Sequence, residues 1–222
     1  TNYVNKCTRK YYIGNVLGLE KPFIQKMSYC LPHFSHEFIN MIKRNPPKKS
    51  KLVNFVFSKK RYSRNKKMMY SYRYLLAGKL LENNINVDIY GSSTNIFKKR
   101  YKNNKKILKN IKSTFDWKNI YEIYKDYKFS IVIENYIHPE YFSEKIMIPL
   151  LCGCIPIYIG CSNINNYFKD YVINLTGKKV RWDYFKIIKI LNNHKKYFKN
   201  VPVEEIEEII HMKNLINEEF IK

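Results

Sequence analysis

The amino-acid sequence predicts an α/β protein with a Rossmann-like parallel sheet covered by helices on both faces. Short apolar runs, rich in β-branched and aromatic residues, alternate along the chain with stretches whose apolar residues recur at helical spacing. The runs are apolar at successive positions, which is typical of strands buried on both faces of a parallel sheet. We therefore expect one domain over residues 51–222, preceded by an N-terminal segment and linker over residues 1–50.

The first strand is expected at residues 52–58, LVNFVFS, after the proline- and lysine-rich stretch RNPPKKSK that indicates a linker. A helix over MMYSYRYLLAGKLLENN should follow, with the paired asparagines at its C-terminal end. Apolar residues recur along it at helical spacing: Met69, Tyr72, Leu76 and Leu80. The second strand, INVDIYG, should stop at Gly91.

The rest of the chain continues the alternation. The lysine-rich stretch at residues 97–113 indicates a solvated loop and helix surface, and WKNIYEIYKDYK indicates an amphipathic helix. FSIVIEN, YFSEKIMIPLLCG and CIPIYIG then predict a strand, a helix and a strand. NINNYF predicts a helical turn, YVINLT a short strand, and the chain from about Trp182 onward a helical tail.

The formal net charge of +23 would ordinarily suggest a polyanionic partner. However, Ala77 is the only alanine, while Lys, Asn, Ile and Tyr are abundant, as expected from an A/T-rich genome, including that of a giant DNA virus. We therefore expect no specific nucleic-acid partner. A polyanion-binding protein remains an alternative, which predicts binding with a steep dependence on salt.

The five cysteines form no CxxC pair, so we expect small buried hydrophobes, compatible with a reducing compartment. His33, His36 and Glu37 lack a further ligand, and no metal site is expected. No membrane-spanning segment is expected, and the start TNYVNKCTRK lacks the apolar region of a signal peptide. These features favour the cytoplasm, although a membrane-anchored Golgi context stays open.

The stretch from Phe129 to Gly160 concentrates the candidate chemistry. Glu134 and Asn135 follow a predicted strand, at the edge where ligands bind in open parallel sheets. Ser143 is a suitable N-cap for the next helix, and Glu144 and Lys145 lie in its first turn. There Glu144 could accept hydrogen bonds from sugar hydroxyls and Lys145 could face a phosphate. A capping carboxylate and a solvated lysine would also explain this pair.

A second candidate is the basic loop SKKRYSRN after the first strand. Arg61 and Arg64 carry planar donors suited to a bidentate hold on a diphosphate, and such cations stabilise the charge of a leaving group. A solvated loop of a lysine-rich chain is the alternative explanation.

The motif IEN (133–135), YFSEK (141–145) and LLCGCIPIYIG (150–160) resembles the donor-binding signature of the α1,3/α1,4-fucosyltransferases. KLVNFVFSKKRYSRN and VDIYG extend the resemblance upstream, so that it covers about residues 50–200. The resemblance implies the C-terminal, donor-binding half of a GT-B glycosyltransferase. This chain departs from the family pattern at a few positions: Ile133, Phe142, Ser143, Cys152 and Cys154.

This resemblance implies transfer of a sugar, fucose in the family's pattern, from a GDP-sugar to a glycan hydroxyl with inversion, and no required metal or other cofactor. It implies that Arg64 contacts the diphosphate, Lys145 a phosphate and Glu144 the sugar ring. Tyr141 and Asn135 would line the donor pocket together with Ser143 and Arg61, and Glu134 would support the loop.

The family's general base, a carboxylate, belongs to a separate N-terminal domain, and residues 1–50 are too few to form one. Glu20 and Glu37 are the only acids before residue 82. We therefore expect the acceptor site to be completed by an upstream domain or by an oligomer. A sugar-nucleotide-binding module without transfer activity of its own is the alternative function.

Overall fold

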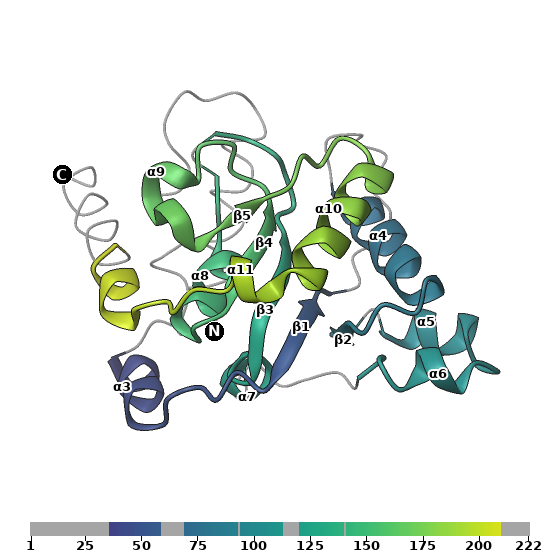
Figure 1. Ribbon diagram of the computed structural model, residues 1–222, viewed down its shortest axis with the longest axis horizontal. Helices are drawn as coiled ribbons and strands as arrows, with labels where there is room; N and C mark the ends of the chain where they lie inside the picture. Colours follow the sequence, from purple (N-terminus) through teal and green to yellow (C-terminus); the bar gives the residue numbers. More distant parts are fainter. Residues whose placement is uncertain (1–35, 59–68, 93, 113–119, 140, 210–222) are drawn as a thin grey trace, which may run out of the picture.

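The computed structural model describes residues 36–58, 69–92, 94–112, 120–139 and 141–209 (Figure 1). Its centre is a five-stranded sheet with the order β2-β1-β3-β4-β5, in which every neighbouring pair is parallel. The strands are β1 (Lys51–Val56), β2 (Asp88–Tyr90), β3 (Tyr127–Ile133), β4 (Ile155–Ile159) and β5 (Ile173–Asn174). The predicted α/β fold with a parallel sheet is confirmed.

Helices connect the strands. They are α3 (His36–Arg44), α4 (Tyr70–Glu82), α5 (Thr94–Arg100), α6 (Lys105–Leu108), α7 (Ile120–Tyr124), α8 (Glu144–Leu151), α9 (Asn165–Phe168), the 3₁₀-helix η4 (Lys169–Tyr171), α10 (Val180–Asn192) and α11 (His194–Tyr197). The step from β1 to β2 runs across the sheet in the opposite direction to the step from β3 to β4. Right-handed crossovers therefore place α4 and α8 on opposite faces, and α10 lies beside α4 (Figure 1).

The two central strands explain why the apolar runs are continuous. Every residue of β4 and all but Lys128 of β3 are buried. Phe129 pairs with Ile155 and Ile133 with Ile159, so that large apolar side chains from both strands fill the core on each face. The observed β1 begins one residue before its predicted start and ends two residues before its predicted end. The observed β2 is shorter than predicted at both ends, and its pairing with β1 covers three residue pairs.

Part of the segment before residue 51 is more ordered than its sequence indicates. The helix α3 buries Ile39 and Ile42, and the Lys43 ammonium lies 2.8 Å from a carboxylate oxygen of Glu207. Lys49 adopts a positive φ of 51° and donates from Nζ to the carbonyl of Cys152 at the end of α8. The described part of this segment is therefore packed against the sheet domain.

The cysteines that the structure describes agree with the prediction of small buried hydrophobes. Cys152, Cys154 and Cys161 are all buried and free. The Cys154 thiol lies 3.1 Å from the carbonyl oxygens of Tyr124 and Tyr127, and burial raises its pKa to about 11. These thiols are structural, whereas Cys7 and Cys30 lie outside the described residues.

The sequence predicts no metal site and no membrane-spanning helix, and the structure bears on these two predictions only within the described residues. Within them, no cluster of three His, Cys, Asp or Glu side chains could hold a metal ion, and His33 lies outside them. None of the helices in these ranges has the length and apolar character needed to cross a membrane.

Candidate functional site

The strand order locates the site. Chain connections leave β1 towards β2 on one side, whereas β3 leads to β4 on the other, so the order reverses between β1 and β3. In open parallel sheets, ligands bind at the carboxyl ends of the strands beside such a switch point. Glu134 and Asn135 directly follow β3 at this end of the sheet, and α4 is the first helix after β1 in the described residues.

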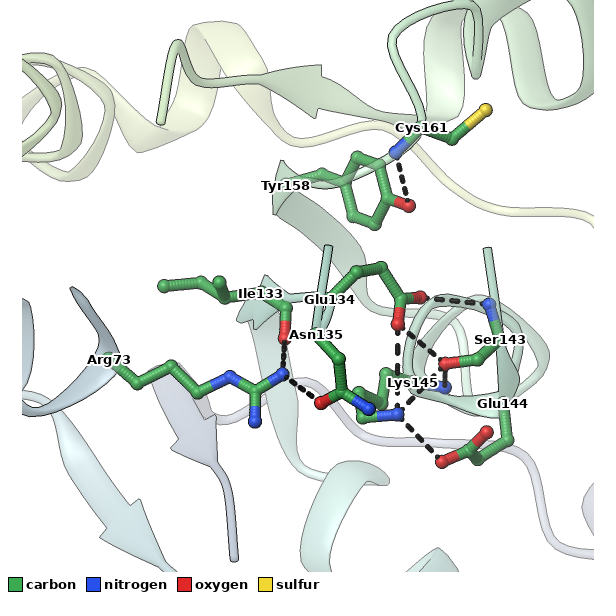
Figure 2. Close-up of polar contacts among 9 residues, drawn as sticks. All are labelled: Arg73, Ile133, Glu134, Asn135, Ser143, Glu144, Lys145, Tyr158 and Cys161. Carbon is green, nitrogen blue, oxygen red and sulfur yellow. Dashed lines mark hydrogen bonds and ion pairs between the residues drawn. The ribbon is translucent and has the colours of Figure 1, made fainter. Parts of the chain in front are cut away.

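Glu134 is completely buried just beyond the carboxyl end of the central strand, β3. Its Oε1 accepts a hydrogen bond from the Ser143 backbone N–H at 2.8 Å, and its Oε2 accepts one from the Ser143 hydroxyl at 2.7 Å (Figure 2). Burial raises the pKa of Glu134, and the ammonium of Lys145, 3.7 Å from Oε2, opposes that rise. Glu134 therefore ties the end of β3 to the start of α8.

Ser143 caps α8, as its position in the sequence predicts. Its extended backbone and its hydroxyl, 3.4 Å from the backbone N–H of Lys145, form the N-cap. Its hydroxyl also lies 3.0 Å from Lys145 Nζ and is therefore a common partner of the acid and the cation. The cap consequently orients both Glu134 and Lys145.

Glu144 and Lys145 lie in the first turn of α8 and form an ion pair. The Lys145 ammonium lies 3.0 Å from Glu144 Oε1, and the exposed fractions of the two side chains are 28% and 14%. Burial by itself would raise the pKa of Glu144, but the charge and hydrogen bond of Lys145 outweigh it and lower that pKa. Burial likewise opposes the charge of Lys145, yet Glu144 and Glu134 raise its pKa. Both groups are therefore held in their charged forms.

Several buried side-chain atoms of the described residues have no hydrogen-bond partner, and one of them is a carboxylate oxygen of Glu144. Its Oε2 is buried and accepts no hydrogen bond from any residue that the structure describes. A carboxylate oxygen in this state carries a desolvation cost that a hydrogen-bond donor, such as a hydroxyl, would remove.

Arg73, in the first turn of α4, is a site residue that the sequence interpretation missed. It is 2% exposed, and its Nη2 donates to the carbonyl of Ile133 at 2.5 Å and to Asn135 Oδ1 at 2.8 Å. Figure 2 shows Arg73 on one side of the segment from Ile133 to Asn135 and Lys145 on the other. The arginine therefore bridges the two sides of the switch point.

A signal for Arg73 is present in the sequence. The buried face of α4 includes Tyr70, Arg73, Ala77 and Leu80, spaced three or four residues apart. A cation within an otherwise apolar helical face is expected to be paired with a specific partner, because an unpaired buried charge is costly.

The other predicted site residues divide into two groups. Asn135 and Tyr141 are buried at this edge, with exposed fractions of 4% and 5%, and the Asn135 carbonyl accepts from the Met69 N–H at 3.0 Å. Arg61 and Arg64 lie outside the described residues, in the segment between β1 and α4.

Gly160, which ends the motif, makes room for this network. A Cβ atom there would lie 2.5 Å from Glu134 Cγ and would also collide with the hydroxyl of Tyr158. That hydroxyl in turn accepts a hydrogen bond from the Cys161 N–H at 2.9 Å (Figure 2). Only glycine fits between the two side chains.

The site thus combines two cations, an oriented amide and a carboxylate with an unused acceptor at a sheet edge suited to ligands. Comparison with known families identifies the kind of domain: the family described as "Glycosyltransferase family 10 (fucosyltransferase) C-term" matches residues 46–200, more than half of the chain. The chain belongs to this family.

Individual relatives of this family 10 domain match over shorter stretches. The human GDP-fucose protein O-fucosyltransferase 3 is 34% identical over 83 residues, which are 37% of this chain and 16% of the relative. The α-(1,3)-fucosyltransferase B of Drosophila melanogaster is 48% identical over 42 residues, which are 19% of this chain and 10% of the relative. The chain therefore aligns with only a small part of these proteins.

Among solved structures, the crystal structure of an α1,3-fucosyltransferase is similar with a TM-score of 0.49 and 18% sequence identity. The similarity covers 84% of this chain and 54% of that protein. The family 10 domain thus spans about half of the solved fucosyltransferase chain.

Proposed function

We propose that this chain is the donor-binding domain of a fucosyltransferase, which binds a GDP-sugar, with GDP-fucose as the first candidate. Membership of glycosyltransferase family 10 supports the proposal, as do the names of its relatives. The observation that carries it is the placement of two cations, Arg73 and Lys145, on either side of the carboxyl end of β3. Beside them lies Glu144, one oxygen of which has no hydrogen-bond partner among the described residues.

In this proposal the two cations hold the diphosphate. Arg73 offers the planar donors suited to phosphate oxygens, and Lys145 adds a point charge at the N-terminus of α8, where the helix dipole also favours an anion. Arg64 and Arg61, in the segment before α4, would add further donors from the same edge. With such cationic neutralisation the reaction would require no metal.

The sugar is proposed to lie against α8. Glu144 Oε2 would accept a hydrogen bond from a sugar hydroxyl, which would satisfy the oxygen that lacks a described partner. Asn135 and Tyr141 would line the pocket, and Ser143 and Glu134 would hold the start of α8 in place. Both oxygens of Glu134 already accept hydrogen bonds from Ser143, so Glu134 is assigned a supporting role rather than a contact with the sugar.

The proposed reaction is a direct displacement with inversion. A hydroxyl of a glycan acceptor attacks the anomeric carbon, the bond from that carbon to the diphosphate oxygen breaks, and GDP leaves with the bonding electron pair. Arg73 and Lys145 stabilise the negative charge that grows on the leaving diphosphate, and they do so more strongly in a partly buried site than in water.

A carboxylate outside this domain is proposed to take the proton of the acceptor hydroxyl. Of the acids at the site, Glu134 is enclosed and Glu144 has a lowered pKa, so neither is suited to be the base. We accordingly propose that residues 51–222 form the donor domain, that residues 1–50 lead into it, and that an upstream domain or an oligomer completes the acceptor site.

The same observation favours a second candidate function, a sugar-nucleotide-binding module without transfer activity of its own. The two functions differ in one measurable respect. A transferase releases GDP from GDP-fucose when a fucose acceptor is present in the full protein, whereas the module binds the donor without turnover.

A thermal-shift screen of nucleotide sugars tests the proposed function. We expect GDP-fucose or another GDP-sugar to stabilise the chain, by about 2.7 kcal/mol at a hundredfold excess over the Kd, and UDP-sugars to stabilise it less. The variants Glu144→Ala, Arg64→Ala and Arg73→Lys should weaken binding. Loss of one charged hydrogen bond corresponds to about a 10- to 100-fold increase in Kd.

Arg100→Lys is the matched control for Arg73→Lys. Arg100 is exposed and lies 2.7 Å from Glu82 on the far part of α4, so the control keeps the type of change and moves it away from the site. Absence of stabilisation by every GDP-sugar in the parent chain would refute the donor assignment, and equal losses in both arginine variants would refute the role of Arg73.

A further inference from the structure

A second buried carboxylate lies outside the motif. Asp183, in the first turn of α10, is completely buried. Its Oδ1 accepts from the Thr176 N–H at 2.8 Å and from the Thr176 hydroxyl at 3.0 Å, and its Oδ2 accepts from the Gly177 N–H at 2.8 Å. These bonds fix the loop that leaves the carboxyl end of β5.

The same carboxylate also reaches α4. The Tyr72 hydroxyl donates to Asp183 Oδ2 at 2.5 Å, which joins α10 to the first turn of the helix that carries Arg73. Tyr72 and Arg73 are consecutive, so their side chains leave the α4 axis about 100° apart. One side chain is bonded to α10 and the other to the end of β3.

Two bonds in different directions from adjacent residues restrict both the rotation of α4 about its axis and its sliding along that axis. If the bond to Asp183 were lost, the first turn of α4 could rotate, and the Arg73 guanidinium would move relative to Asn135. A long arginine side chain amplifies a small rotation of the helix at its tip.

We infer that Tyr72 and Asp183 are positioning residues that set the orientation of Arg73 for the donor diphosphate. The inference rests on the proposed function, because it assigns a purpose to the orientation of Arg73. Neither residue needs to contact the donor.

The loop held by Asp183 provides a second connection to the same edge of the sheet. Gly177 has a φ of +65°, and a Cβ atom there would lie 2.5 Å from Ile137 Cδ1 and 2.7 Å from Ile159 Cγ2. The loop after β5 is therefore packed closely against Ile137, which follows β3, and against Ile159, the last residue of β4. Asp183 thus holds two neighbours of the site, namely this loop and the first turn of α4.

A double-mutant cycle on GDP binding by the full chain tests the inference. Tyr72→Phe removes only the hydroxyl, and Arg73→Lys keeps the charge but removes the planar donors. We expect Tyr72→Phe to raise the Kd for GDP about 3- to 10-fold when Arg73 is present, and by less than about 1.5-fold in the Arg73→Lys background. Calorimetry at a temperature where every variant is folded measures these values.

Tyr101→Phe is the matched control, because the Tyr101 hydroxyl donates to Glu82 at 2.8 Å on the exposed side of α4. It should leave the Kd for GDP unchanged. Asp183→Glu, which keeps the charge and lengthens the side chain, serves as a second variant and should also raise the Kd only when Arg73 is present.

The outcomes distinguish a failure of the positioning role from a failure of the proposed function. A purely structural role of Tyr72 would change the Kd equally in both backgrounds or not at all, and either result would overturn the inference while GDP binding and the Arg73→Lys effect stand. If the parent chain binds no GDP, the proposed function itself fails, and this inference fails with it.

Discussion

Glu134 and Asp183 are two buried carboxylates that do the same structural work in different electrostatic surroundings. Each is completely enclosed, and each binds the backbone N–H and the hydroxyl of a Ser or Thr in a loop at the carboxyl edge of the sheet. Glu134 faces a cation, Lys145, whereas the hydrogen bonds to Asp183 come from uncharged donors.

The two carboxylates differ in whether a charged or a neutral side chain lies beside them. Lys145 is shared between Glu134 and Glu144 and is 28% exposed, so it can exchange a partner for an incoming anion. The Tyr72 hydroxyl beside Asp183 is held neutral, since burial and its hydrogen bond to Asp183 both raise its pKa. The first carboxylate therefore belongs to the proposed donor site, and the second belongs to the proposed support of that site.

The largest expected effect concerns the glycine beside Glu134. Gly160→Ala should lower the free energy of unfolding by about 1–3 kcal/mol or more, because its Cβ atom would collide with Glu134 and Tyr158 in a closely packed interior. Urea denaturation measures the change. Gly78→Ala is the matched control: its Cβ atom would find ordinary contacts at 3.8 Å, and a helical alanine should stabilise by about 0.5–1 kcal/mol. Similar losses in both variants would contradict the packing argument.

A smaller effect distinguishes the two carboxylates directly. Asp183→Asn should cost about 1–3 kcal/mol, because both carboxylate oxygens face backbone N–H groups that cannot become acceptors. Glu134→Gln should cost less, since one oxygen faces the Ser143 hydroxyl, which can rotate to accept from an amide, and the raised pKa already favours a neutral group. Chemical denaturation of both variants at neutral pH measures the difference. Equal costs would remove the distinction between the two surroundings.

The smallest effect is a pH dependence. The pKa of Glu144 is lowered from its ordinary value of 4.5, so its contribution to stability is present above pH 4.5 and is lost as the pH falls through the folded-state pKa below that value. Glu144→Gln should therefore reduce the loss of stability on acidification in this range. Urea midpoints between pH 6 and about 3 measure it, and an unchanged slope in the variant would show that Lys145 does not stabilise the Glu144 carboxylate.

Much of the fold and part of the candidate site could be predicted because their signals are local. Continuous apolar runs indicated β3 and β4, helical spacing indicated α4, and Ser143 was identified as the N-cap of α8. Helix α3 was not predicted, although its apolar residues recur at helical spacing, because a helix of nine residues depends for its stability on burying Ile39 and Ile42 against the domain. The roles proposed for Glu144 and Lys145 stay predictions until binding is measured.

The sequence by itself determined that strands and helices alternate, and that the acids and the lysine of the motif stand between a strand and a helix start. Only the tertiary structure decided that Arg73 meets Asn135 across the switch point and that Tyr72 meets Asp183 more than a hundred residues away. The physical reason is the range of the forces involved. Backbone hydrogen bonding and apolar periodicity act between neighbours in the chain, whereas a buried charge finds its partner only after distant strands have paired.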